Sequence, residues 1–206
     1  MSDDWPKIQV EREACADLFE SLSPEQWTMA SWCKGWTVRE VAGHLIVATQ
    51  LSTGSFFSHL ASAGFSFTKM SESDAKRCSA GDPAGLAAEM RAGALRRTHP
   101  PGPLTAMLGE AVVHGEDIRR PLGLSRTFPD DTLVAVADFF KKSNLLIGAK
   151  RRVSGLHLTA TDLDWSNGEG PEVKGPMASL ILAMTGRRQV HDDLSGEGVA
   201  TLAGRS

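Results

Sequence analysis

The sequence has few cysteines, and their spacing is unlike that of a disulfide framework. Only three occur among 206 residues, Cys15, Cys33 and Cys78, and none forms a CxxC pair. This pattern argues against structural disulfides and against a cysteine-based zinc finger, and it fits a reducing cytoplasm. Nothing in the sequence places a cation beside Cys33 or Cys78, so neither thiol is predicted to be reactive.

Long apolar runs and blocks of like charge are also absent. No run approaches the roughly 18 residues of a membrane span, and the N-terminus lacks the pattern of a secretory signal. The formal net charge of −3 is spread along the chain, which argues against a nucleic-acid footprint and against a polybasic membrane patch. We therefore expect a cytoplasmic protein that binds a small molecule, with no nucleic-acid or membrane partner.

Helical periodicity is the dominant pattern up to residue 149. The box Thr37-Val38-Arg39-Glu40 is typical of a helix start, with threonine at the N-cap and glutamate three residues later. The serine-rich stretch 64–83 is predicted to be a loop. The predicted helices span residues 5–22, 37–63, 83–98, 103–122 and 129–148. We expect residues 1–149 to form an up-down four-helix bundle.

The pattern changes after residue 149. Residues 155–161 alternate at period two, and turn-forming residues over 165–170 precede a second short segment at 172–174, which predicts a β-hairpin. Pro176 then begins a short apolar helix. Residues 150–206 are thus expected to form a small α/β appendage on a mainly α protein.

Three ionisable residues share one face of the helix predicted over 103–122. Glu110, His114 and Asp117 stand at i, i+4 and i+7, within roughly 60° of one another on a helix. The flanking residues are apolar: Leu104, Met107, Ala111 and Ile118 on one side, Ala106 and Val113 on the other. The neighbouring charges Glu116, Arg119 and Arg120 are predicted to point to solvent. Ionisable groups on an apolar face are costly to bury unless they are paired or bind a cation.

His44 is likewise an ionisable residue on an apolar face, in the helix predicted over 37–63. Its own face carries Val41, Val47, Ala48 and Leu51, so the imidazole should point into the bundle. Two imidazoles and one carboxylate from facing helices suit Zn²⁺, Ni²⁺, Fe²⁺ or Co²⁺ and leave a coordination position open. Spacing alone leaves two alternatives: Asp117 either ligates or accepts a ring N–H, and each histidine is either a ligand or a core residue.

Two segments resemble motifs of a known protein family. The segment from Trp36 to Leu45 resembles the W-T-V-x-[ED]-V-x-x-H-L signature of DinB-like metal-binding proteins. The segment from Glu110 to Ile118 resembles the E-x-x-x-H-x-x-D element of the mycothiol-dependent maleylpyruvate isomerase branch. The C-terminal segments TDLDW, GPEVKGP and MTGRR are also similar to that branch, so the resemblance covers nearly the whole chain.

The resemblance implies a DinB-like bundle that holds a divalent metal, with zinc expected first, through His44, Glu110 and His114. With these three residues as ligands, Asp117 is expected to accept a ring N–H from a ligating histidine rather than to ligate. The resemblance also implies that the metal activates the thiolate of mycothiol, the cosubstrate, for isomerisation or S-transfer. The nucleophile would be this thiolate rather than a protein side chain. Two alternatives stay open: a non-catalytic metal- or ligand-binding module, and a hydrolase that uses metal-bound water.

The remaining candidates are given lesser roles. His59 would lie about 22 Å from His44 on the same predicted helix, too far to share its metal. Arg187 is a candidate anchor for an anionic substrate, although a cation at the end of a helix is also favourable without any ligand. Dimerisation through an exposed bundle face is left open. The residues predicted to lie in solvent or in packing are His99, His157 and His191 and the three tryptophans Trp27, Trp32 and Trp36.

Overall fold

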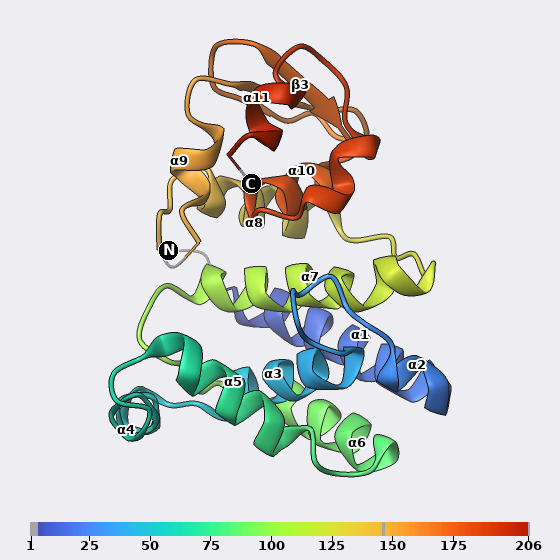
Figure 1. Cartoon of the computed structure of the whole chain (residues 1–206), viewed down its shortest axis with the longest axis vertical. Helices are drawn as coiled ribbons and strands as arrows, with labels where there is room; N and C mark the ends of the chain where they lie inside the picture. The colour runs from blue at the N-terminus through green and yellow to red at the C-terminus, as the bar shows by residue number, and fades with distance from the viewer. Residues whose placement is uncertain (1–3, 146, 206) are drawn as a thin grey trace. The chain divides into compact units, whose positions relative to one another are not determined.

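The protein consists of two compact units in a computed structural model that describes residues 4–145 and 147–205 (Figure 1). The first unit is Met1–Ser125 and the second is Arg126–Ser206. No helix in the described ranges is both long enough and apolar enough to cross a membrane. The division differs from the expected boundary at residue 149, because helix α8 (Asp130–Phe140) packs against helix α10 (Met177–Met184) of the second unit.

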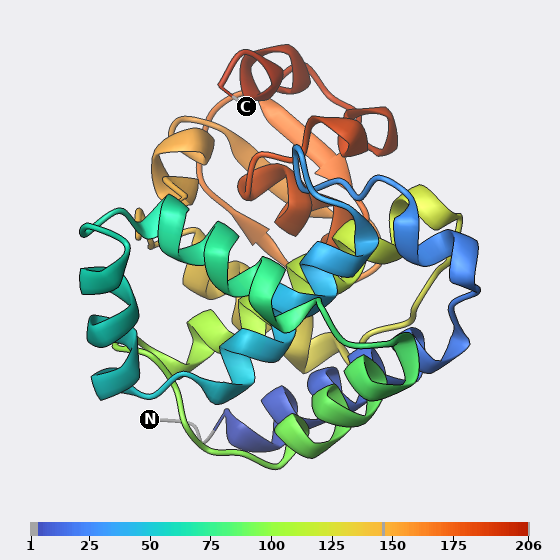
Figure 2. The same cartoon turned by 60° about the horizontal axis from the view of Figure 1, so that its bottom comes forward.

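The first unit is a helical bundle whose four main helices are α1, α3, α6 and α7. Its helices are α1 (Trp5–Ser21), α2 (Pro24–Thr28), α3 (Val38–Gln50), α4 (Thr53–Ser62), α5 (Phe67–Cys78), α6 (Pro83–Ala94), α7 (Leu104–Arg119) and the short 3₁₀ helix η1 (Arg120–Leu122). Helices α1 and α3 each pack against both α6 and α7, and α5 covers α3 (Figure 2). This arrangement brings α3 and α7, the two helices with the candidate ligands, into direct contact.

The capping box at the start of α3 is confirmed. The Glu40 amide donates to Thr37 Oγ1 at 3.3 Å, and the Thr37 amide donates to Glu40 Oε2 at 2.8 Å. The single helix predicted over 37–63 is wrong, because α3 ends at Gln50 and a second capping box opens α4. There the Ser55 amide donates to Ser52 Oγ at 3.2 Å, and the Ser52 amide donates to Ser55 Oγ at 2.9 Å. Serine at an N-cap satisfies helix donors that otherwise lack partners, which stabilises the break.

The loop predicted over 64–83 is also wrong, since most of it is helix α5. Ser66 caps this helix by accepting a hydrogen bond from the Lys69 amide, and Lys76 and Arg77 occupy its last turn, where cations are favourable. Helix α5 lies very close to α3 at Gly43, where an added Cβ would come 2.9 Å from the Ser79 side chain. The absence of a side chain at Gly43 therefore permits the close contact.

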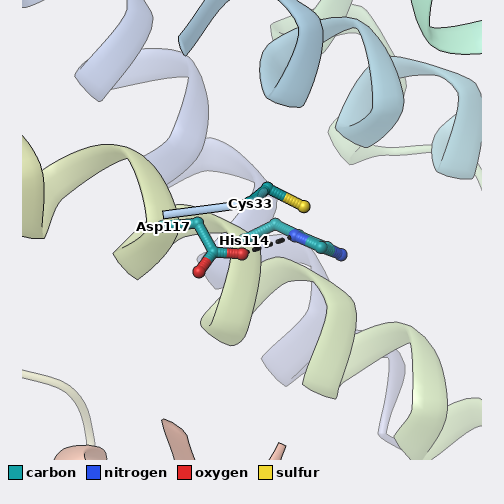
Figure 3. Close-up of side chains that lie close together, drawn as sticks. All are labelled: Cys33, His114 and Asp117. Carbon is teal, nitrogen blue, oxygen red and sulfur yellow. Dashed lines mark hydrogen bonds and ion pairs between the residues drawn. The ribbon is translucent and has the colours of Figure 1, made fainter. Parts of the chain in front are cut away.

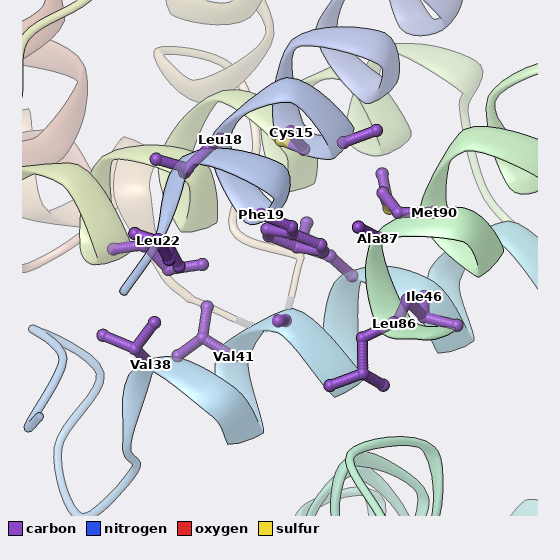
Figure 4. Close-up of a cluster of buried hydrophobic side chains, with 14 of the residues drawn as sticks. Cys15, Leu18, Phe19, Leu22, Val38, Val41, Ile46, Leu86, Ala87 and Met90 are labelled. Atoms are coloured by element: carbon purple, nitrogen blue, oxygen red, sulfur yellow. The ribbon is translucent and has the colours of Figure 1, made fainter. Parts of the chain in front are cut away.

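A cluster of apolar side chains fills much of the bundle interior (Figure 4). The Phe19 ring of α1 meets the Trp27 ring edge-on at 5.6 Å, and both side chains are buried. Trp27 thus packs the bundle as predicted. The buried cluster also includes Leu18, Leu22, Val38, Val41, Leu45, Ile46, Leu86, Met90 and Ile118. Fully burying a side chain of this size contributes roughly 1.5–3 kcal/mol, so this cluster is the main source of stability in the first unit.

The second unit combines a small sheet with short helices. Besides α8 and α10 it contains α9 (Ala149–Val153), β1 (His157–Ala160), β2 (Ser166–Asn167), β3 (Glu172–Gly175), the 3₁₀ helix η2 (Arg188–Asp193) and α11 (Val199–Ala203). The strand order is β2-β1-β3, with β1 antiparallel to β2 and parallel to β3. The expected hairpin between 155–161 and 172–174 is wrong, because β1 makes its hairpin with β2. Gly168 and Gly170, with φ of +88° and +125°, turn the chain between β2 and β3.

Candidate metal centre

His44, Glu110 and His114 meet where α3 faces α7. His44 Nε2 lies 3.0 Å from Glu110 Oε2, and His114 Nε2 lies 3.3 Å from the same oxygen. The two imidazole rings are 4.8 Å apart and nearly perpendicular, at 80°. The ligand atoms of the three residues all lie within 4.8 Å of one another. Two nitrogens and one oxygen from facing helices thus converge on one small volume.

Each imidazole is oriented through its other nitrogen. His114 Nδ1 lies 2.8 Å from Oδ2 of the fully buried Asp117, and His44 Nδ1 lies 3.3 Å from the Ser71 hydroxyl of α5. Histidines that bind metals usually make such a bond on the side away from the ion, which fixes the ring and leaves the other nitrogen as the ligand. Sequence reasoning missed Ser71 because its helix was taken for a loop, although Ser66, Lys76 and Arg77 mark the ends of a helix.

The electrostatics couple Glu110 to the two histidines. Burial alone would raise the Glu110 pKa, but hydrogen bonds from His114 and His44 outweigh burial and hold that pKa well below its ordinary value. Burial alone would lower the His114 pKa, but hydrogen bonds to Asp117, Cys33 and Glu110 hold that pKa well above its ordinary value. Without a metal the carboxylate is therefore ionised near neutral pH, whereas the His114 ring would have to lose a proton to bind an ion.

The donor set fits a divalent metal. Tetrahedral zinc with bonds of about 2.0–2.2 Å to nitrogen and oxygen places neighbouring ligand atoms about 3.4 Å apart. The two nitrogen–oxygen distances to Glu110, 3.0 and 3.3 Å, are already close to this value. The Glu110 side chain is 34% exposed, whereas those of His44 and His114 are 17% and 14% exposed.

The segment 29–37 between α2 and α3, here called the 29–37 loop, adds two residues to the site. Its Trp32 amide donates to the Asp117 carbonyl of α7 at 3.0 Å. The Trp36 ring packs edge-on against His44 at 5.4 Å, so this tryptophan forms a wall of the site. Cys33 lies beside His114 and Asp117, and the ligand atoms of these three residues form a second group within 4.8 Å (Figure 3). No sequence signal pointed to Cys33, because it stands far from α7 along the chain.

Two charges on α7 were wrongly predicted to lie in solvent. Glu116 and Arg119 are both buried. Glu116 Oε2 accepts a hydrogen bond from Arg120 Nε at 2.8 Å, and Arg119 Nη2 donates to the Ala14 carbonyl at 3.1 Å. Their burial is tolerated because each side chain has polar partners. A buried ionisable side chain on α7 is therefore not necessarily a metal ligand.

The other histidines of the described ranges belong to neither group of ligand atoms. His59 lies on α4 rather than on the helix of His44, and its Nδ1 is 2.8 Å from Asp74 Oδ2 of α5. His99 Nδ1 and His157 Nδ1 lie 2.7 Å from the carbonyls of Pro100 and Gly168, respectively. The 22 Å separation assumed for His59 therefore rested on a helix that does not exist.

Arg187 lies in the second unit, directly before η2. Its backbone amide donates to the Leu182 carbonyl at 3.0 Å, and its Nη1 donates to the Thr185 carbonyl at 3.2 Å. These bonds fix the backbone at the end of α10. A role in anchoring an anionic substrate stays a prediction.

Comparison with known families shows which family the chain belongs to. The family model described as the mycothiol maleylpyruvate isomerase N-terminal domain matches residues 8–119, more than half of the chain. The chain belongs to this family. The matched range of the maleylpyruvate isomerase N-terminal domain contains His44, Glu110 and His114, and it corresponds to the helical bundle.

Two solved structures are similar over nearly the whole chain. A mutant of the mycothiol-dependent maleylpyruvate isomerase has a TM-score of 0.63 and 15% identity, and the unmutated isomerase has a TM-score of 0.60 and 14% identity. Each comparison covers 95% of this chain and 92% of the other. At this identity the likeness shows the fold, which confirms the predicted mainly α, DinB-like architecture with a small C-terminal α/β region. Comparison with curated proteins finds no match.

Proposed function

We propose that this protein is a divalent-metal-dependent enzyme that uses mycothiol to isomerise, or to modify by S-transfer, a small electrophile. The observation that carries the proposal is the convergence of two imidazole Nε2 atoms on one Glu110 oxygen, with both rings oriented by bonds on their far sides. Family membership and fold support the thiol and the isomerase class.

In this proposal His44, Glu110 and His114 hold the cation. A divalent cation, when bound, lowers the pKa of a thiol that joins it and makes the sulfur a nucleophilic thiolate near neutral pH. Asp117 and Ser71 keep the imidazoles aligned, and the Trp36 ring limits the space beside His44. No cysteine of the chain has to act as the nucleophile.

The two proposed reaction types differ in what happens to the carbon–sulfur bond. In an isomerisation the sulfur adds to one carbon of a double bond, the resulting single bond rotates, and the carbon–sulfur bond breaks again, so the thiol is regenerated. In a transfer the carbon–sulfur bond remains and one thiol is consumed per turnover. Measuring thiol consumption against product therefore separates isomerase from transferase.

The test is a turnover assay with purified protein, mycothiol and maleylpyruvate, performed with zinc-loaded and with chelator-treated protein. We expect turnover only when both metal and thiol are present. Turnover without thiol would instead support the hydrolase, in which metal-bound water attacks. Stoichiometric metal without turnover on maleylpyruvate or other electrophiles would support the binding module.

The compartment of the protein is also part of the proposal. All three cysteines are free thiols in the structure. Free thiols persist in reducing compartments, which supports the cytoplasm expected from the sequence. Cell fractionation with immunodetection of the protein would test this.

A further inference from the structure

The Cys33 thiol lies at the edge of the proposed metal centre. Its sulfur, a ligand atom of His114 and a carboxylate oxygen of Asp117 are all within 4.8 Å of one another (Figure 3). His114 is itself one of the three proposed ligands. A thiol beside three converging ligands is a further ligand of the kind that zinc prefers.

The 29–37 loop holds this thiol against α7. The Trp32 amide is bonded to the Asp117 carbonyl at 3.0 Å, which ties the residue before Cys33 to the helix of His114. The Cys33 amide donates to Ser31 Oγ at 3.1 Å, and the Trp36 amide donates to the Cys33 carbonyl at 3.0 Å. The backbone on both sides of Cys33 is therefore fixed, and the side chain keeps one rotatable bond.

Ligation requires the Cys33 side chain to move toward the other proposed ligands. With bonds of about 2.3 Å to sulfur and 2.0–2.1 Å to nitrogen, a tetrahedral ion places these two ligands about 3.6 Å apart. The Cys33 sulfur is already within 4.8 Å of a His114 nitrogen, although it does not belong to the group formed by His44 and Glu110. Rotation about the Cα–Cβ bond is the movement that would carry the sulfur toward the open position.

We propose that Cys33 is a fourth protein ligand of this centre and occupies, in the absence of thiol, the position that the substrate thiol takes. This inference rests on the proposed function, because it assumes the metal held by His44, Glu110 and His114. The incoming thiol loses its proton as its sulfur binds, and the displaced Cys33 sulfur takes up one proton. The exchange is therefore balanced and needs no oxidant.

The test uses Co²⁺ alone as a probe, because thiolate ligands of Co²⁺ give a charge-transfer band in the near ultraviolet and the visible d–d bands report binding itself. With no thiol added, we expect the charge-transfer band in the wild type and in Cys78→Ser, and at least a tenfold weaker band in Cys33→Ser. Cys78 is a matched control, since it is half-buried like Cys33 but lies outside both ligand groups. Adding 2-mercaptoethanol to cobalt-loaded Cys33→Ser should restore the band.

Each result decides between the proposals. Visible d–d bands without a charge-transfer band in the wild type, or an unchanged band in Cys33→Ser, would overturn the role of Cys33 and leave the three-ligand centre intact. Absence of d–d bands in the wild type would overturn both. If Cys33→Ser does not fold, alkylation of the wild type replaces it: metal should slow labelling of Cys33 at least tenfold and leave Cys78 unchanged. Equal labelling of Cys33 with and without metal would overturn the inference.

Discussion

Two helix interfaces of the same bundle differ in how their ionisable side chains are paired. Between α1 and α6 an apolar cluster fills most of the interior, and the buried Arg12 guanidinium donates to the backbone carbonyls of Gly93 and Arg96. The ion pairs of Arg91 with Asp17 and Glu20 lie on the exposed rim. Between α3 and α7 the ionisable groups of His44, Glu110 and His114 lie inside. Exposed ion pairs contribute little stability, whereas charged groups inside a bundle are costly unless they are paired or bind an ion. The contrast supports the proposal that the second interface binds an ion, while the first stabilises the fold.

Removing a proposed ligand should give the largest effect on the interface between α3 and α7. His114→Ala should abolish stoichiometric zinc binding and reduce thiol-dependent turnover by about a thousandfold or more, because it removes one of the three ligands that hold the ion whether Cys33 or the substrate thiol fills the fourth position. Metal content by mass spectrometry and steady-state rates measure both effects. His59→Ala is the control, since His59 pairs with Asp74 outside both ligand groups, and it should keep its metal. Full zinc content in His114→Ala would contradict the account.

The apolar interface should respond in stability alone. Phe19→Ala leaves a cavity beside Trp27 and should lower the free energy of unfolding by about 3–5 kcal/mol. Denaturant titration measures this loss. The fraction that remains folded should still bind one zinc per chain. A variant with normal stability but less metal would show that the two interfaces are not separate.

Weakening the support of a ligand should have an intermediate effect. Asp117→Asn keeps the size of the side chain but removes the charge that faces His114 Nδ1, and support residues of this kind affect metal affinity by about 10–100-fold. Competition with a chromogenic chelator measures the affinity. If Asp117 were itself a ligand, zinc binding would be lost as completely as in His114→Ala.

A pair of glycines tests the close contact that places Ser71 beside His44. Gly43→Ala forces a Cβ against Ser79 and should destabilise the protein by about 1–3 kcal/mol. Gly54→Ala, in a helix with open space around it, should be neutral or stabilise by about 0.5–1 kcal/mol. Thermal unfolding of both variants checks the difference. Equal melting temperatures for the two variants would show that the contact between α3 and α5 is not tight.

The smallest effect is the pH dependence of the metal-free protein. A raised pKa in the folded state means that His114 stabilises the fold at low pH, and that this stability is lost as the pH rises through the raised pKa. The lowered pKa of Glu110 means that its carboxylate stabilises the fold at higher pH, and that this stability is lost as the pH falls through the lowered pKa. The melting temperature after chelation should therefore peak between the two. His114→Asn should remove the decline on the alkaline side, and His59→Asn should not.

The contrast between the two interfaces could be predicted in part from the sequence. Helical periodicity and the Thr37–Glu40 box identified the bundle and the start of α3, and the positions of His44, Glu110 and His114 on apolar faces predicted that they would meet. Periodicity could not show the break at Ser52, because the helix-forming pattern continues through it. The capping serines of α4 and α5 were the missed signal.

Two other features could not be derived from local patterns. The approach of Cys33 to His114 depends on how the 29–37 loop docks on α7, which is a tertiary contact between distant parts of the chain. The burial of Glu116 and Arg119 likewise depends on polar partners supplied by tertiary packing, such as the Ala14 carbonyl for Arg119. Charge on a helix predicts exposure only where no such partner is present.

The most direct test of the central claim is anomalous diffraction from crystals of the protein loaded with zinc. The account predicts one anomalous peak per chain in the bundle, about 2.0–2.2 Å from a nitrogen of His44, a nitrogen of His114 and an oxygen of Glu110. A peak at other residues only, or no peak at this position in crystals of protein that contains stoichiometric zinc, would contradict it.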